Sequence, residues 1–268
     1  MIAFTKAHAY GNDFLYVPAT ALADADHAAT ARRLCDRHRG VGADGLILYT
    51  LTPQGATMKL LNADGSPSEL SGNGLRGLAA IVAREWRRTG RENERDVVVE
   101  TTAGFKRLAL EDVSGTSYRF AAEMGPPTGI AERRLEAAGE TVTATVLAVG
   151  NPQCVVLGRL PDDERFERLG PALERHPAFP NRTNVEFAEV ESPDRVRIRI
   201  WERGVGPTES SGTGSCAAAV AAAAHGGALR DVEVVSPGGT QRVIWTSDGV
   251  TLIGWAEILA DGTFCAQL

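Results

Sequence analysis

The chain has 268 residues, 43% of them hydrophobic and 23% charged, and its formal net charge is −6. This is the composition of a folded globular protein, so wholesale disorder is excluded. The acidic balance argues against a nucleic-acid partner, which requires a basic surface, and the chain has no run of 18 apolar residues that could span a membrane. We therefore expect neither nucleic acid nor a membrane as a partner.

The start of the chain and its cysteines suggest a cytoplasmic protein. Residues 1–8 lack the charged and apolar regions of a signal peptide. The cysteines form no Cys-x-x-Cys pair, so we expect neither a disulfide framework nor a structural zinc site; they are Cys35, Cys154, Cys216 and Cys265. The sequence also lacks a His-x-x-x-His pair and a phosphate-binding P-loop, and it predicts no metal site.

The hydrophobic pattern predicts both strands and helices. Short runs of β-branched or alternating apolar residues predict strands, and apolar residues at a spacing of three and four predict helices. In chain order the pattern gives a strand at 58–61, a helix from Gly74 to Gly90, strands at 96–101 and 195–200, a helix at 215–225 and a strand at 231–235. The second helix consists almost entirely of small apolar residues, so we expect it to be buried.

The chain contains an internal repeat. Residues 58–74 and 198–214 match without a gap, and both segments end in Glu-x-Ser-Gly-x-Gly. Ser71, for example, recurs 140 positions later as Ser211. The repeat predicts an α+β protein of two pseudo-symmetric lobes, each a mostly antiparallel sheet around a central helix.

The repeat and a turn-like segment at 112–117 suggest where the lobes divide. We expect an N-terminal lobe at 1–118 and a C-terminal lobe at 119–258. Residues 259–268 form a terminal segment that we expect to return to the N-terminal lobe.

The repeated motif places a serine just before each predicted helix. A helix N-terminus presents unpaired N–H groups and a partial positive charge, which suit a small anion such as a carboxylate. Two such ends, each with a polar side chain, can supply the base and the acid that invert a carbon next to a carboxylate. The residues in these positions are Ser71 and Ser211. For either motif taken alone, the alternative is a simple helix cap.

Several segments, in chain order, resemble the diaminopimelate epimerase family. They are Lys6–Phe14, Gly40–Leu46, Leu61–Ser66, Ser71–Arg76, Gly150–Pro152, Arg182–Phe187, Glu202–Gly206 and Ser211–Gly214. The resemblance implies a fold of two pseudo-symmetric lobes with the active site in the cleft between them. It also implies a homodimer that epimerises LL-diaminopimelate to the meso form, without pyridoxal phosphate or any other cofactor, in lysine and peptidoglycan biosynthesis.

The same resemblance implies which residues contact a small amino-acid substrate. Those expected at the distal amino-acid end and the substrate amine are Asn12, Asn62, Asn151, Asn184, Glu202 and Arg203. Those expected to hold the reacting carboxylate at the two helix N-termini are Gly72, Asn73, Gly212 and Thr213.

The sequence departs from the family where the chemistry is most demanding. The family's two catalytic bases are cysteines, but both positions, Ser71 and Ser211, are serine here. A thiol has a pKa of about 8.5, whereas a serine hydroxyl is a far weaker acid and needs a neighbouring base to accept its proton. Glu69 and Glu209, each two residues before a serine, are candidate partners.

These departures leave three functions open. The first is a cofactor-independent epimerase in which the two serines stand at the acid/base positions. The second is a racemase or isomerase of another small amino or hydroxy acid, and the third is a catalytically inactive amino-acid-binding relative. The sequence also differs from the family at Gly77, where cysteine is frequent, and at Gln153, where histidine is common. Another explanation is that both cysteines were replaced deliberately to trap a substrate complex. The departures at Gly77, Gln153 and also Glu209 argue against it, because such a replacement would have left these positions unchanged.

Overall fold

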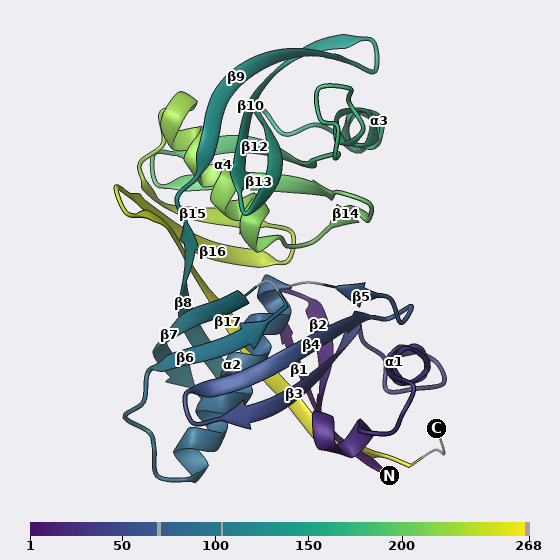
Figure 1. Ribbon diagram of the computed structural model, residues 1–268. Helices are drawn as coiled ribbons and strands as arrows, with labels where there is room; N and C mark the ends of the chain where they lie inside the picture. The colour runs from purple at the N-terminus through teal and green to yellow at the C-terminus, as the bar shows by residue number, and fades with distance from the viewer. Residues whose placement is uncertain (69–70, 103, 266–268) are drawn as a thin grey trace. The chain divides into compact units, whose positions relative to one another are not determined.

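The computed structural model describes residues 1–68, 71–102 and 104–265 (Figure 1). In these ranges no helix is long and apolar enough to cross a membrane. Contacts between Cα atoms divide the chain into two compact units, each of which is described by itself below.

Unit 1 comprises residues 1–122 and 254–268, and unit 2 comprises residues 123–253. The sequence analysis placed the division after residue 118 and the terminal segment from residue 259. In the structure the chain passes into unit 2 after Ala122 and back into unit 1 at Gly254. Two strands, β8 (Ser117–Gly125) and β17 (Gly249–Phe264), contain these crossing points.

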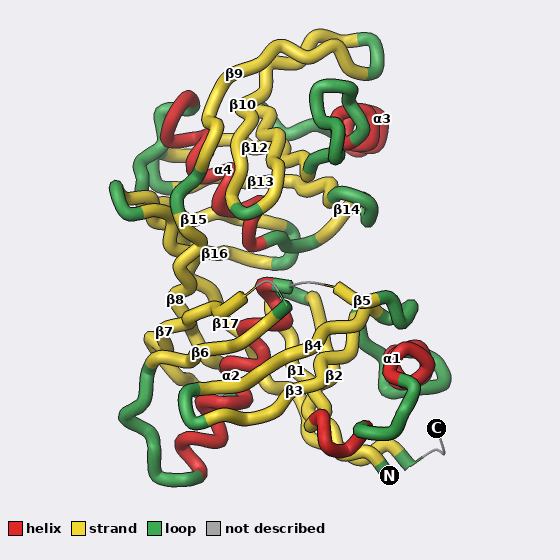
Figure 2. The backbone as a smooth tube through the Cα atoms, viewed as in Figure 1, coloured by secondary structure: helices red, strands yellow, loops and turns green. Residues whose placement is uncertain are grey.

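In unit 1, the paired strands close into a ring around a helix (Figures 1 and 2). The ring runs through β1 (Ile2–Ala9), β2 (Asn12–Pro18), β3 (Gly45–Thr52), β4 (Gly55–Asn62), β6 (Asp96–Thr101), β7 (Gly104–Ser114), β8 (Ser117–Gly125) and β17 (Gly249–Phe264). The short β5 (Pro67–Ser68) pairs with β4, a 3-10 helix spans Ala19–Leu22, and α1 (His27–Cys35) packs on β3 and β4. The enclosed helix is α2 (Gly72–Arg88).

Helix α2 is enclosed because most of its surface is apolar or small. Leu78, Ala79, Ala80 and Val82 are fully buried, although they face different directions around the helix. The helix contacts β1, β2, β4, β6 and β7. It ends at Arg88, and Gly90 follows with a φ of 76°, a left-handed conformation that favours glycine after a helix.

Unit 2 repeats this plan. Its strands are β9 (Thr128–Ala137), β10 (Glu140–Val149), β11 (Asn151–Leu157), β12 (Asn184–Ser192), β13 (Arg195–Glu202), β14 (Gly206–Thr208), β15 (Asp231–Ser236) and β16 (Gly239–Thr246). Helix α4 (Gly212–His225) packs on β10–β13, β15 and β16, and α3 (Asp163–Glu174) packs on β9, β12 and β13. In each unit two parallel pairs interrupt a mostly antiparallel sheet: β2–β3 and β4–β6 correspond to β11–β12 and β13–β15. The predicted α+β class, with a sheet around a central helix in each half, is confirmed.

The packing of α2 explains why residue 77 is glycine. A Cβ atom at Gly77 would collide with the phenol oxygen of Tyr16. Tyr16 is fully buried, and its Oη donates a hydrogen bond of 2.9 Å to the Gly74 carbonyl. The corresponding residues of unit 2 are Ala217 and Val155, both fully buried. Unit 1 therefore carries the larger side chain on the strand and the smaller on the helix.

Replacing Gly77 by alanine is expected to destabilise the fold by about 1–3 kcal/mol, because the added methyl group overpacks the space filled by Tyr16. Thermal or urea unfolding of the purified variant measures this loss. Tyr16→Phe should restore part of it, since the clashing oxygen is then absent. A Gly77→Ala variant as stable as the parent would contradict this account of the packing.

Candidate active site

Both serines of the repeated motif cap a central helix. Ser71 and Ser211 have extended backbones, and each side-chain oxygen accepts a hydrogen bond from the N–H of the glycine three residues later. The Oγ–N distances are 3.1 Å at Gly74 and 3.2 Å at Gly214. The first turn of each helix also carries N–H groups that have no partner within the helix. This arrangement favours negative charge at either cap.

The glycine three residues after each serine allows the helix to lie close to the sheet. A Cβ atom at Gly74 would lie 2.8 Å from Cδ1 of Ile47, and one at Gly214 would lie 2.7 Å from Oε1 of Glu186. Both distances are shorter than a Cβ atom tolerates, so a larger residue at either position would force the end of the Ile47 or Glu186 side chain to move.

In unit 2, sheet register brings the predicted substrate contacts of the C-terminal half together. Gln153 of β11 pairs with Asn184 of β12, and β13 ends beside them at Glu202. The side-chain oxygen of Asn184 accepts from the backbone N–H of Arg203 over 2.9 Å. The structure therefore places Asn184, Glu202 and Arg203 next to one another, with Asn151 two residues before Gln153.

Two carboxyl groups lie beneath the α4 cap. The Ser211 hydroxyl forms a hydrogen bond with the Glu202 side chain, and this bond lowers the pKa of Glu202 less than burial raises it. Glu186 is fully buried, and burial together with the nearby charge of Glu202 raises its pKa well above the usual range. These surroundings favour the protonated, neutral form of Glu186.

Gln153 connects these carboxyl groups to the asparagines. With its amide nitrogen toward Glu186, Gln153 donates to Oε1 over 2.9 Å, and its oxygen accepts from Asn184 Nδ2 at 3.3 Å and Thr213 Oγ1 at 3.2 Å. This orientation agrees with Asn184, whose own oxygen is already occupied by the Arg203 N–H. Gln153 thus supports both the buried acid and the first turn of α4.

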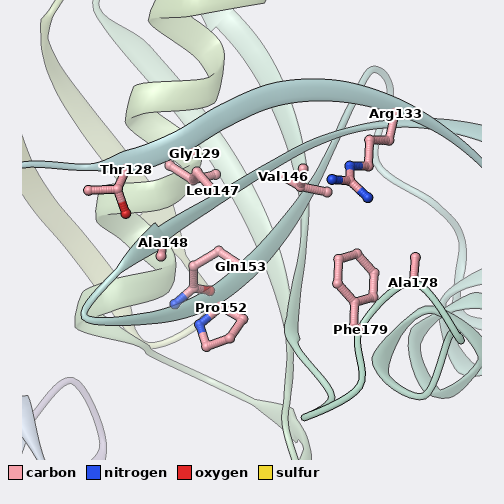
Figure 3. Close-up of a pocket in the computed structure, with 10 residues that line it drawn as sticks. All are labelled: Thr128, Gly129, Arg133, Val146, Leu147, Ala148, Pro152, Gln153, Ala178 and Phe179. Carbon is pink, nitrogen blue, oxygen red and sulfur yellow. The ribbon is translucent and has the colours of Figure 1, made fainter.

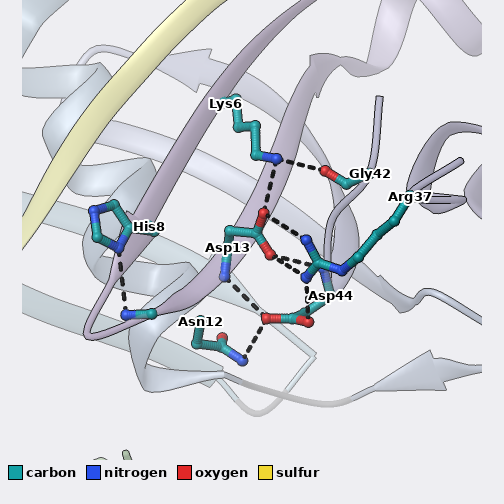
Figure 4. Close-up of polar contacts among 8 residues, drawn as sticks. Lys6, His8, Asn12, Asp13, Arg37, Gly42 and Asp44 are labelled. Carbon is teal, nitrogen blue, oxygen red and sulfur yellow. Dashed lines mark hydrogen bonds and ion pairs between the residues drawn. The ribbon is translucent and has the colours of Figure 1, made fainter. Parts of the chain in front are cut away.

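In unit 1, a charged cluster holds Asn12 (Figure 4). Its Nδ2 donates to Asp44 Oδ2 over 3.3 Å, and Arg37 links Asp44 to Asp13 with bonds of 2.8 and 2.7 Å. Lys6 lies 2.8 Å from Asp13 on the other side. Burial tends to raise the pKa of Asp13, but the hydrogen bonds from Arg37 and Lys6 outweigh it and lower the pKa overall. The Oδ1 atom of Asn12 is buried and has no partner among the described residues.

The other predicted contacts of unit 1 differ in exposure. Asn62 is exposed at the end of β4, and its Nδ2 donates to Ser66 over 2.9 Å. Asn73 is buried in the first turn of α2, where its oxygen accepts from Arg76 over 3.0 Å. Arg76 is itself only 1% exposed and stacks over the Tyr10 ring. The structure therefore assigns Asn73 an internal partner as well as a place at the helix N-terminus.

A hollow of about 260 Å³ lies in unit 2 and shares Gln153 with the group of side chains near the α4 cap (Figure 3). It is lined by Thr128, Gly129, Arg133, Val146, Leu147, Ala148, Pro152, Gln153, Ala178 and Phe179. Neither helix cap nor any predicted substrate contact lines it. We therefore do not assign the reaction to this hollow.

Sequence reasoning missed part of this site. It considered Glu69 and Glu209 as partners of the serines, but the Ser211 hydroxyl bonds to Glu202, and Glu209 is exposed; Glu69 lies outside the described residues. It also overlooked Glu186, although a glutamate in the middle of the apolar strand Asn184–Ala188 was a detectable signal. In the described ranges no three His, Cys, Asp or Glu side chains gather as a metal site would require.

The sequence matches known proteins over most of its length. A family model described as diaminopimelate epimerase matches residues 4–130 and 145–258. The chain belongs to the diaminopimelate epimerase family. Curated diaminopimelate epimerases similar to it include that of Desulforudis audaxviator, 43% identical over 97% of this chain and 98% of the relative, and that of Desulfitobacterium hafniense, 38% identical over 91% and 90%.

Solved structures of proteins with other names share the fold. A probable proline racemase from Agrobacterium radiobacter has a TM-score of 0.67 with 17% identity, covering 100% of this chain and 94% of that one. A PhzF-family phenazine biosynthesis protein from Bacillus anthracis has a TM-score of 0.66 with 14% identity, covering 99% of both chains. At these identities the likeness extends to the fold alone.

Proposed function

We propose that this protein is an isomerase that inverts the α-carbon of an amino acid without a cofactor, converting LL-diaminopimelate to the meso form for lysine and peptidoglycan biosynthesis. The observation that carries the proposal is the pair of serine-capped helix N-termini in a chain that aligns with diaminopimelate epimerases over nearly its whole length. The capped N-termini suit the carboxylate next to the reacting carbon, whose negative charge increases when the α-proton leaves.

In this proposal each residue has a defined role. Ser71 and Ser211 stand at the two acid/base positions. The N–H groups of the first turns hold the reacting carboxylate, at Gly72, Asn73, Gly212 and Thr213. The distal amino acid and the substrate amine are held by Asn12, Asn62, Asn151, Asn184, Glu202 and Arg203. The unpartnered oxygen of Asn12 supports this, because it is free to accept from an ammonium group.

A second candidate function follows from the serines themselves. A hydroxyl is a much weaker acid than a thiol, so a protein that binds the amino acid without inverting it would show the same contacts. A racemase or isomerase for another small amino or hydroxy acid is the remaining alternative within the fold.

Incubation with LL-diaminopimelate in heavy water distinguishes these functions. We expect deuterium to enter the α-carbon and the meso isomer to accumulate, which mass spectrometry and chiral chromatography would measure. Binding detected by calorimetry without any exchange would identify a binding protein. If neither binding nor exchange occurs, diaminopimelate is not the substrate.

The proposal extends to location and assembly. A cytoplasmic location agrees with the buried thiols of Cys35 and Cys154, which form no disulfide in the described part of the chain. The homodimer is proposed from the family resemblance.

A further inference from the structure

The two serine positions are related by the repeat but lie over different side chains. We call the three residues near the α4 cap, and the three that correspond to them in unit 1, the floor of each cap. In unit 1 the floor consists of Phe14, Ile47 and Asn62, and in unit 2 of Gln153, Glu186 and Glu202. The members correspond at offsets of 139, 139 and 140 positions, close to that of the serines.

Strand pairing and close contacts support this correspondence. Phe14 pairs with Gly45 between parallel strands in unit 1, as Gln153 pairs with Asn184 in unit 2. Ile47 is the side chain that a Cβ atom at Gly74 would meet first, and Glu186 fills the same place at Gly214. An apolar side chain and a carboxyl group therefore occupy equivalent positions under the two caps.

The unit 1 floor offers Ser71 no group that can take its proton. Phe14 and Ile47 are buried and apolar, and Asn62 is an exposed amide bonded to Ser66. In the described part of unit 1, no hydrogen bond joins Ser71 to a carboxylate; its oxygen accepts from the Gly74 N–H. Within the described residues of unit 1, Ser71 therefore holds a proton but has no carboxylate partner that would remove it.

The unit 2 floor provides such a partner. Ser211 accepts from the Gly214 N–H and bonds to Glu202, so its hydroxyl has both a stabilising donor and a carboxyl neighbour. Glu186 lies beside Glu202, and two carboxylates so close do not both ionise readily. The less buried Glu202 ionises first, while Glu186 stays neutral and is held by Gln153.

We propose that the two acid/base positions are chemically unequal: Ser211 with Glu202 accepts the α-proton, Glu186 and Gln153 are positioning residues for Glu202, and Ser71 is the weaker group. This rests on the proposed function. The Cα–H bond breaks, its proton passes to Ser211 Oγ, and the serine's own proton passes to the Glu202 carboxylate. The electron pair stays on the substrate as an enediolate, and no oxidant or reductant is needed. Return of the proton from the same side then competes with inversion.

One test needs no substrate. Ser71→Cys and Ser211→Cys are made singly, and the ultraviolet absorbance of each thiolate is followed against pH, with the parent protein subtracted. The thiol at position 71 should ionise about one to three pH units below that at position 211, because, among the described residues, carboxyl groups lie beside position 211 and not beside position 71. The groups that can influence the ionisation of Glu186 are Glu202, Cys154 of β11 and the N–H groups of the first turn of α4.

Glu186→Gln is the decisive second change, because glutamine keeps the shape of a protonated glutamate and cannot ionise. It should lower the thiol pKa in the Ser211→Cys protein and leave that in the Ser71→Cys protein unchanged. Equal ionisation at the two positions, or a Glu186→Gln effect that is the same in both proteins, would overturn the inference whether or not diaminopimelate is the substrate.

The second test uses LL- and meso-diaminopimelate separately in heavy water. For one of the two isomers, the rate of deuterium exchange with retention of configuration should exceed the rate of inversion. Ser211→Ala should reduce that exchange by about 10²–10⁴-fold, whereas Ser71→Ala should slow inversion and leave the exchange. Equal loss of exchange in both variants and both isomers would contradict the inference. Absence of binding by the parent protein would reject the proposed function. The thiol titrations would then still decide whether the two serine positions are chemically unequal.

Discussion

A variant with cysteine at both Ser71 and Ser211 should exchange the α-proton of diaminopimelate about 10²–10⁴-fold faster than the parent protein. Each position caps a helix, and its side chain accepts an N–H hydrogen bond, so a thiolate placed there is stabilised. A thiol ionises near a pKa of about 8.5, or lower at a helix N-terminus, whereas a serine hydroxyl does not ionise in this range. Deuterium incorporation measured by mass spectrometry gives the ratio of rates.

The single variants show where the gain arises. Ser71→Cys should supply most of it, because Ser71 has no carboxylate partner in the described part of its unit. Ser247→Cys, which adds a thiol to an exposed turn, is the matched control and should leave the rate unchanged. If the double cysteine variant exchanges no faster than the parent, the side chains at 71 and 211 do not limit the reaction and the assigned roles are wrong.

Glu186→Gln should make the protein progressively more stable than the parent as the pH rises. The pKa of Glu186 in the folded state lies well above its ordinary value of 4.5, so the folded protein retains a proton that the unfolded chain releases. The contribution of Glu186 to stability is therefore complete below about pH 4.5 and declines as the pH rises toward the folded pKa. Over that interval the difference between variant and parent should grow by up to about 1.4 kcal/mol per pH unit.

Urea unfolding of both proteins at several pH values measures this slope. Glu191→Gln, on the same strand, is the matched control, because Arg197 and Arg195 hold the pKa of Glu191 below its usual range. Its stability relative to the parent should fall as the pH rises toward about 4.5 and stay constant above that, in the interval where the Glu186→Gln difference grows. A pH-independent difference between Glu186→Gln and the parent would show that Glu186 is ionised in the folded protein.

Much of the fold was predictable because it depends on local patterns. The strands at 58–61, 96–101, 195–200 and 231–235 fall within β4, β6, β13 and β15, and both predicted helices are present. Other elements were not predicted. Helix α3, for example, carries proline at 171, which does not favour a helix interior.

The substrate contacts were suggested by family resemblance, but the partners of those residues were not. Asn184, Glu202 and Arg203 come together only because β11, β12 and β13 are neighbours in one sheet. Glu209 is nearer to Ser211 in the sequence than Glu202 is, so the sequence did not indicate that Ser211 bonds to Glu202. The chain between Glu202 and Ser211 reverses direction through β14, and this reversal brings the two residues together.

The sequence by itself determined the repeated serine caps, since Ser-Gly-x-Gly forms its hydrogen bond within four residues and needs no distant partner. It also determined the duplication and the family. Only the tertiary structure decided that the caps are unequal. Side-chain direction alternates along a strand, so strand register alone selects which residues face the helix: Ile47 beneath Ser71, but Glu186 beneath Ser211.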